Sequence, residues 1–207
     1  MADYIITVAR GFGSGGRTVG KMLANKLNID YYDMDLLRLA SEESGINIEL
    51  FNKADEKIKT GFFRRYNRSF GERLLPPSDS DFVSDDNLFN YQAKIIRDLA
   101  DKQNCVIIGR CADYILRDRQ NVVRLYFYAE HDVCVQNVTD MYGLSEKDAD
   151  ERIEAIDRSR AAYYKYYTGN EWDNVSNYDL CINTGKLGFE KSTDVVLDYL
   201  RQINLIK

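Results

Sequence analysis

The chain has 207 residues, of which 44% are hydrophobic and 29% are charged, and its formal net charge is −5. This length suits one α/β domain with a hydrophobic core, and the composition excludes an intrinsically disordered chain. The mild acidity argues against nucleic acid as a partner, because that role usually needs a basic face. We find no signal-peptide pattern and no apolar run near the roughly 18 residues of a membrane span. We therefore expect a cytoplasmic protein that does not bind membranes.

Short apolar segments alternate with helical patterns along the chain. The predicted strands cover residues 4–9, 29–32, 105–108, 122–128 and 180–182. Helical spacing of apolar residues follows the glycines of residues 11–20, and predicts further helices at 35–43, 88–99 and 192–203, with a long charged helix that starts at a capping box of Ser145 and Asp148. Strands that alternate with helices indicate crossover connections and therefore a parallel sheet.

The glycine-rich segment between the first strand and its helix carries the clearest chemical signal. Residues 11–18 read GFGSGGRT, which matches the phosphate-loop pattern G-x-x-x-x-G-K-[ST] except for arginine in place of lysine. Glycines let the backbone wrap around an anion, and the following helix adds its positive N-terminal end. The pattern predicts an ATP site, whereas the alternative is a glycine-rich turn without a ligand. The expected binding residues are Gly11, Gly13, Ser14, Gly15, Gly16, Arg17 and Thr18.

Two side chains at the end of this loop have chemical roles of their own. The Thr18 hydroxyl is placed to hold Mg²⁺, and the basic side chain before it is expected to reach the β- and γ-phosphates. We assign Arg17 a catalytic role. Arginine is bulkier and more directional than lysine, so nucleotide binding should survive this replacement more readily than catalysis.

Four segments together make the chain recognisable. They are residues 10–17, 31–37 (YYDMDLL), 107–116 (IIGRCADYIL) and 156–160 (IDRSR), the last followed by the tyrosines of 163–167. The sequence resembles the cytidylate kinase-like family, which is related to the bacterial cytidylate kinases, over nearly its whole length. The resemblance implies a P-loop NTPase three-layer fold: a five-stranded parallel sheet of order 2-3-1-4-5 with helices on both faces. It also implies an acceptor-binding insertion at about 47–87 and a lid at about 150–178.

The resemblance and the strand ends suggest further site residues. Arg110 follows a strand and would bind the acceptor phosphate, unless it is an ordinary surface arginine. Asp33 and Asp35 also follow a strand, and they would either contact the acceptor or metal-bound water, or cap the next helix. Arg158 and Arg160 correspond to lid arginines that stabilise the transferring phosphoryl group, and the alternative is a solvated helix face.

Two weaker signals complete the set. The loop after the last strand, residues 183–186, corresponds to a segment near adenine in the resembling kinases. The tyrosines at 163, 164, 166 and 167 would stack on a base or, more simply, pack the lid helix against the domain.

These features predict an ATP-dependent, Mg²⁺-requiring phosphotransferase with a small nucleotide substrate of the CMP or dCMP kind. Another small acceptor stays open, because Cys111 stands where cytidylate kinases have aspartate. The alternative from a different class is a nucleotide-binding sensor or interaction protein with little turnover, which Arg17 favours. The sequence does not predict the oligomeric state.

Overall fold

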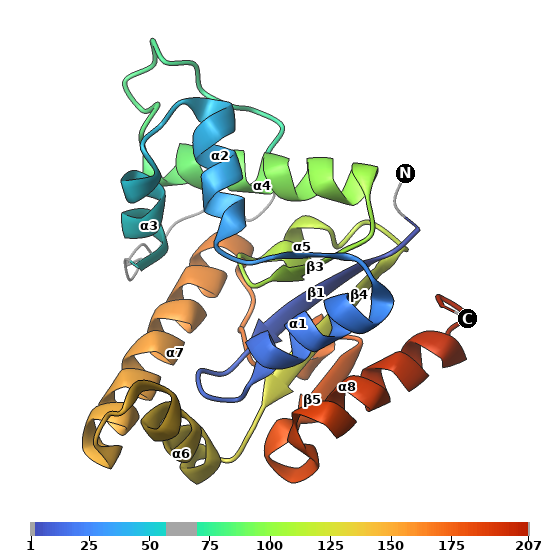
Figure 1. Cartoon of the computed structure of the whole chain (residues 1–207). Coiled ribbons are helices and arrows are strands. Elements are labelled where there is room, and N and C mark those ends of the chain that lie inside the picture. The colour runs from blue at the N-terminus through green and yellow to red at the C-terminus, as the bar shows by residue number, and fades with distance from the viewer. Residues whose placement is uncertain (1–2, 57–69, 207) are drawn as a thin grey trace.

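The computed structural model describes residues 3–56 and 70–206. Within this part of the chain, five strands form one parallel sheet in the order β2-β3-β1-β4-β5 (Figure 1). The strands are β1 (Ile5–Arg10), β2 (Asp30–Tyr32), β3 (Cys105–Ile108), β4 (Val122–Tyr128) and β5 (Leu180–Asn183). The predicted fold class and strand order are confirmed.

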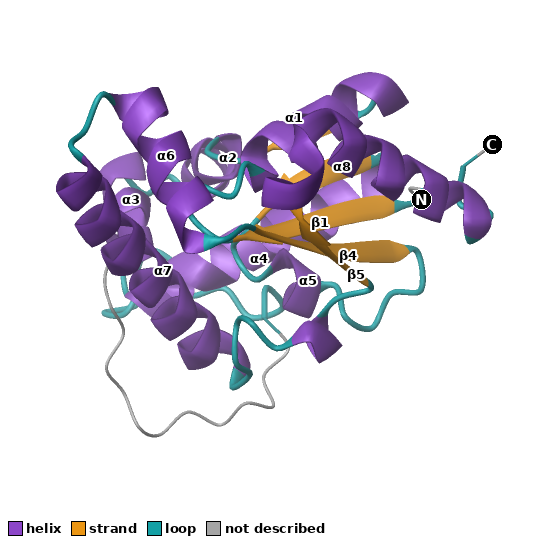
Figure 2. Cartoon of the chain, turned by 90° about the horizontal axis from the view of Figure 1, so that it is seen from below, coloured by secondary structure: helices purple, strands orange, loops and turns teal. Residues whose placement is uncertain are grey.

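Helices cover both faces of the sheet. They are α1 (Gly16–Leu27), α2 (Asp35–Ser44), α3 (Ile48–Glu56), α4 (Asp85–Lys102), α5 (Ala112–Ile115), α6 (His131–Tyr142), α7 (Glu146–Thr168) and α8 (Thr184–Gln202), with a 3₁₀ turn η1 (Val175–Asn177). Figure 2 shows α1 and α8 on one face of the sheet and α4 and α5 on the other. No helix of the described residues is both long enough and apolar enough to cross a membrane.

Two hydrophobic cores result from this layering, because successive side chains of a strand point to opposite faces. Ile5 of β1 belongs to the core beneath α4 and α5, whereas Ile6 and Val8 belong to the core beneath α1 and α8. The cores hold the sheet rigid between its helices. A rigid sheet can position the loops that follow its strands.

The predicted N-terminal cap of the long charged helix α7 is confirmed. Ser145 caps α7, where its Oγ accepts a hydrogen bond from the Asp148 backbone N–H at 3.1 Å. Helix α8 differs from the prediction, since it begins at Thr184 rather than near residue 192. The Asn183 side chain caps this earlier start, and Gly188, with φ 74° and ψ 171°, kinks the helix and interrupts its apolar pattern.

The stretch expected to form an acceptor-binding insertion, about 47–87, is described in part, and its role stays a prediction. Helix α3 opens it, residues 57–69 lie outside the described residues, and α4 closes it. Asn87 fixes the proline-containing stretch onto α4: its side chain accepts from the Leu75 N–H at 2.9 Å and donates to the Phe82 carbonyl at 2.7 Å. Helices α2, α3 and α4 gather at one end of the molecule (Figure 1).

Candidate active site

The loop between β1 and α1 owes its shape to glycines. Gly13 and Gly15 have positive φ angles of 80° and 76°, which side-chain-bearing residues rarely adopt. A Cβ at Gly13 would lie 2.7 Å from the Cys134 carbonyl oxygen, and one at Gly15 would lie 2.1 Å from Cε1 of Phe189. Glycine is therefore required at both positions by conformation and by space.

Several backbone N–H groups at the N-terminus of α1 have no hydrogen-bond acceptor in the described part of the chain. The N–H groups of Gly15, Gly16, Arg17 and Thr18 donate no hydrogen bond to any group in the described part of the chain. Ser14 differs, because its hydroxyl is buried and donates to the carbonyls of the loop and of β4. Ser14 thus holds the loop in place through its side chain, while the following N–H groups lie at the N-terminus of α1, the kind of place where proteins can bind anions.

Two cavities meet beside this loop. One, of about 350 Å³, is lined by the loop, by the last turns of α6 and by Phe189. The other, of about 410 Å³, is lined by the ends of β1 and β3, by the segment after β2 and by α7. We call the first the phosphate-loop cavity and the second, after the acceptor that is predicted to bind at Arg110, the acceptor cavity. Three arginines line both cavities: Arg10, Arg17 and Arg160.

Arg17 lies at this junction but is engaged with a carboxylate. Its Nε donates to Asp33, and this hydrogen bond raises the pKa of Arg17 above its ordinary value. The Asp33 side chain is only 11% exposed and lines the acceptor cavity, whereas that of Arg17 is 54% exposed. The ion pair therefore links the phosphate loop to the segment after β2.

Arg160 is held by contacts with the phosphate loop. Its Nη1 donates to the Arg10 carbonyl at 3.1 Å and to Asp157 Oδ1 at 3.2 Å, and Asp157 in turn accepts from the Phe12 N–H at 2.9 Å. Burial raises the pKa of Asp157 and lowers that of Arg160, while their mutual attraction opposes both shifts. Asp157 thus ties α7 to the loop, a contact that was not predicted from the sequence.

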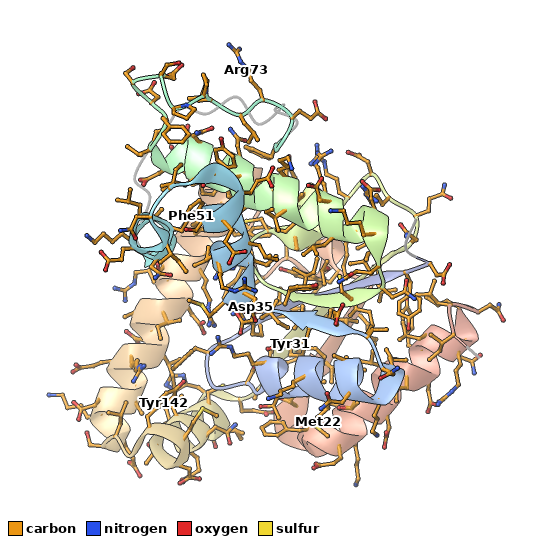
Figure 3. The ribbon with its side chains drawn as sticks, turned by 45° about the horizontal axis from the view of Figure 1, so that its top comes forward. Met22, Tyr31, Asp35, Phe51, Arg73 and Tyr142 are labelled. Carbon is orange, nitrogen blue, oxygen red and sulfur yellow. The ribbon has the colours of Figure 1, made fainter. Side chains whose placement is uncertain are left out.

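The structure does not bring two of the predicted residues, Arg158 and Asp35, to either cavity. Arg158 is 69% exposed and lies 3.5 Å from Glu154. It points away from both cavities because it is two residues from Arg160, and residues two apart on a helix are separated by about 200° around its axis. Asp35 is 61% exposed and pairs with Arg38. Figure 3 shows Asp35 at the start of α2, apart from Tyr142 at the α6–α7 end of the site. Capping by either aspartate is also not seen, since Met34 is the N-cap of α2 and no side chain bonds there.

Arg110 lies in a strained turn at the end of β3. Gly109, Arg110 and Cys111 have successive φ angles of 69°, 56° and 54°. Non-glycine residues in this region cost energy and persist where the surroundings hold them, often at functional sites. The Arg110 guanidinium lines the acceptor cavity, 3.5 Å from Gln92 Oε1 and 3.5 Å from the sulfur of Met34. Its position therefore agrees with the prediction, and its role stays a prediction.

The tyrosines of α7 have two kinds of surroundings: some pack in the core and others line the acceptor cavity. Tyr167 is buried and stacks on Phe89 with ring centroids 3.7 Å apart, whereas Tyr163 and Tyr164 line the acceptor cavity. The Tyr164 hydroxyl donates to Asp113 Oδ2 at 2.6 Å. Burial raises the pKa of Asp113 to about 6. Nothing near Asp113 along the chain distinguishes it from an ordinary helix residue, so this carboxyl was not among the predicted site residues.

Residues 183–186, the segment expected near adenine, begin α8 and contact Glu130 instead. Asn183 caps α8 and donates to Glu130 at 3.0 Å, and Lys186 lies 3.8 Å from the same carboxylate. Residues 183–186 do not line the phosphate-loop cavity, whereas Phe189 from the same helix does.

Comparison with known proteins agrees with this arrangement. The model of the cytidylate kinase-like family matches residues 5–186. The chain belongs to the cytidylate kinase-like family. Among the curated relatives of this family member are the cytidylate kinases of Halobacterium salinarum and Sulfolobus acidocaldarius. The first is 23% identical over 198 residues, which cover 94% of the chain and 88% of the relative. The second is 25% identical over 194 residues, which cover 93% of the chain and 92% of the relative.

Solved structures extend the comparison. An uncharacterized protein from Eubacterium ventriosum superimposes on this cytidylate kinase-like chain with a TM-score of 0.70 at 27% identity, covering 96% of the chain and 98% of that protein. The shikimate kinase of Bacteroides thetaiotaomicron gives a TM-score of 0.54 at 14% identity, with coverage of 96% and 98%. The second likeness shows the fold alone. Family and fold together support a nucleotide-kinase-like function.

Proposed function

We propose that this protein transfers a phosphoryl group from ATP to a small anionic acceptor, with a nucleoside monophosphate of the CMP or dCMP kind as the first candidate. The observation that carries the proposal is the junction of two cavities at Arg10, Arg17 and Arg160. A donor in one cavity and an acceptor in the other would meet at this positive charge. Phosphoryl transfer depends on such positioning and on electrostatic stabilisation of the transferring group.

The residues of the phosphate-loop cavity fit ATP and Mg²⁺. The N–H groups of Gly15, Gly16 and Arg17 have no partner in the described part of the chain and would hold the donor phosphates. Thr18 lines the same cavity, and its hydroxyl would coordinate the ion. Bound Mg²⁺ supplies neutralisation of the charge on the donor phosphates.

The acceptor cavity supports an acceptor that is both anionic and partly apolar. Arg110 would bind its phosphate, and Ile156, Tyr163 and Trp172 offer apolar surface for a ring. Cys111 is buried and brings no charged group to the place where cytidylate kinases have aspartate. The anion, rather than a base edge recognised by a carboxylate, would then dominate recognition of the acceptor.

In this mechanism the protein positions the two substrates and stabilises the transferring phosphoryl group, and it exchanges no proton with either substrate. A phosphate acceptor is largely ionised at neutral pH, so no residue has to remove a proton from it. Arg160 would lie against the phosphoryl group in transit, held there by Asp157 and the Arg10 carbonyl. A side chain held in advance loses little entropy when charge develops in the transition state.

One observation favours a second function, that of a nucleotide sensor with little turnover. Asp33 holds Arg17 in an ion pair, which would weaken its contact with the donor phosphates. Purified protein with ATP, Mg²⁺ and a panel of nucleoside monophosphates tests both functions when product formation and thermal stabilisation are measured together. Diphosphate products support the kinase, whereas stabilisation by ATP without any product supports the sensor.

A further inference from the structure

Arg10, the last residue of β1, has surroundings unusual for a charged side chain. By strand alternation it shares a face with Ile6 and Val8, which are buried beneath α1. Its Nε is buried without a hydrogen-bond partner, and no ion pair includes Arg10 among residues 3–56 and 70–206. Lysine and arginine side chains are almost never placed in this way unless something pairs them.

Two glycines leave room for this side chain. A Cβ at Gly16, in the phosphate loop, would lie 2.5 Å from the Arg10 Cβ. A Cβ at Gly109, at the end of β3, would lie 2.3 Å from Arg10 Nη1. Any larger residue at either position would displace the arginine. The stem and the guanidinium of Arg10 therefore pass through space that both loops keep open, and they emerge where the two cavities meet.

The charges around Arg10 are mostly of its own sign. Burial is the main cause that lowers the pKa of Arg10 to about 9, and repulsion from the three other arginines of the site contributes to this shift, whereas the carboxylates of Asp33 and Asp157 oppose it. Since Asp33 already pairs with Arg17 and Asp157 with Arg160, neither carboxylate is left to pair with Arg10. A group that carries several negative charges would relieve this repulsion and offer hydrogen-bond acceptors to the guanidinium.

We propose that Arg10 is a catalytic residue whose guanidinium contacts the phosphoryl group in transit, in the role that lysine has in the usual phosphate loop, while Arg17 stays paired with Asp33. This inference rests on the proposed function. In the step, an acceptor oxygen forms a bond to the γ-phosphorus and the bond to the β–γ bridging oxygen breaks. The electron pair of that bond stays on the leaving nucleoside diphosphate, and Arg10 keeps its proton throughout.

Arg10→Met tests the proposal, with Arg17→Met as the comparison and Arg201→Met, on an exposed arginine of α8, as the matched control. We expect Arg10→Met to lower kcat at least about 100-fold with little change in the KM for the acceptor, and Arg17→Met to lower it about tenfold. Arg10→Lys should restore part of the loss, because it returns the charge without the planar fork. Arg201→Met should match the unsubstituted protein.

Melting temperature gives a readout that a structural role would move in the opposite direction. Removing a half-buried charge that has no ion-pair partner in the described part of the chain should raise the melting temperature of Arg10→Met by about 2–4 °C. A fall in melting temperature with kcat retained would assign Arg10 to the fold and overturn the inference. Unchanged kcat in a stable Arg10→Met protein would also overturn it and leave the proposed kinase function intact.

Binding separates failure of the inference from failure of the proposed function. If the unsubstituted protein turns over no acceptor, the proposed function fails, and Arg10 is then tested by calorimetry with ADP and with a non-hydrolysable ATP analogue. Arg10→Met should weaken analogue binding about tenfold and leave ADP binding within about threefold, because Arg10 reaches only the γ-phosphoryl group. Equal losses for both nucleotides, or no loss for either, would refute the contact.

Discussion

The two cavities are built in different ways, although they share three arginines. The phosphate-loop cavity draws most of its wall from residues 10–18 and from a single helix, α6. The acceptor cavity collects residues from the ends of β1 and β3, from the segment after β2, from α7 and from Trp172. The first depends on local backbone conformation, and the second depends on how distant segments pack together.

This difference suggests how each cavity would respond to change. A loop that needs glycine at fixed positions tolerates no added Cβ, so binding there should be lost abruptly. A cavity made of side chains from several elements should lose individual contacts one at a time, and each loss should affect a different step.

The largest effect is expected from Gly16→Val. Its Cβ would lie 2.5 Å from the Arg10 Cβ, so the loop would have to shift and its anion-binding N–H groups would move. Unsubstituted protein in ATP at 100 times Kd should gain about 2.7 kcal/mol of stability, and the variant should gain almost none. Thermal unfolding with and without ATP measures this. Gly45→Asn is the control, since Gly45 has nothing within 4 Å of an added Cβ and asparagine tolerates its positive φ of 73°. Equal stabilisation of Gly16→Val would mean that ATP does not bind at the loop.

Arg160→Ala should come next, with Arg158→Ala as its matched neighbour. Loss of Arg160 should lower kcat by about 10²–10³-fold and change ATP affinity little, because its contribution is expected in the transition state. Arg158 is 69% exposed, so its removal should leave kcat within about threefold. Steady-state kinetics of both variants checks this, and similar losses for both would mean that α7 turns in solution to present either side.

Arg110→Gln should separate the two cavities. The side chain lines only the acceptor cavity, so the KM for a phosphorylated acceptor should rise about 10–100-fold while the KM for ATP stays the same. Initial rates with each substrate varied in turn provide the measurement. A parallel rise in both constants would contradict a role confined to the acceptor.

A smaller, pH-dependent effect is expected at Asp113, which joins α5 to α7 through the Tyr164 hydroxyl. Burial raises its pKa to about 6 in the fold, above the ordinary value of about 3.9 in an unfolded chain. Between these values the folded state holds the extra proton, so the stability that this group contributes falls as pH rises from about 4 to about 6.

Asp113→Asn should therefore be close to the unsubstituted protein in stability at pH 4 and more stable by about 1–3 kcal/mol at pH 8. The asparagine oxygen can still accept from Tyr164. Urea unfolding at the two pH values measures the difference. An equal difference in unfolding free energy at pH 4 and pH 8 would show that Asp113 does not titrate in this range.

The sequence by itself determined the features that depend on neighbouring residues. The strand ends, the cap at Ser145 and the phosphate loop are set by short-range rules: alternation of apolar residues, an oxygen that can meet free N–H groups, and glycines where φ is positive. These rules hold whatever the rest of the chain does. The strand order and the insertion and lid boundaries came from the family resemblance, and the structure confirms the strand order.

Only the tertiary structure decided which charged residues meet. Helix α7 carries charges on most sides, so its sequence pattern could not tell that Arg160 turns inward and Arg158 outward. Arg10 reads in the sequence as the polar end of a strand, and its burial depends on Gly16 and Gly109 approaching it from two other segments. Charge is costly to bury, so a sequence pattern assigns charged residues to the surface. Only the packed fold shows which charged side chain is enclosed.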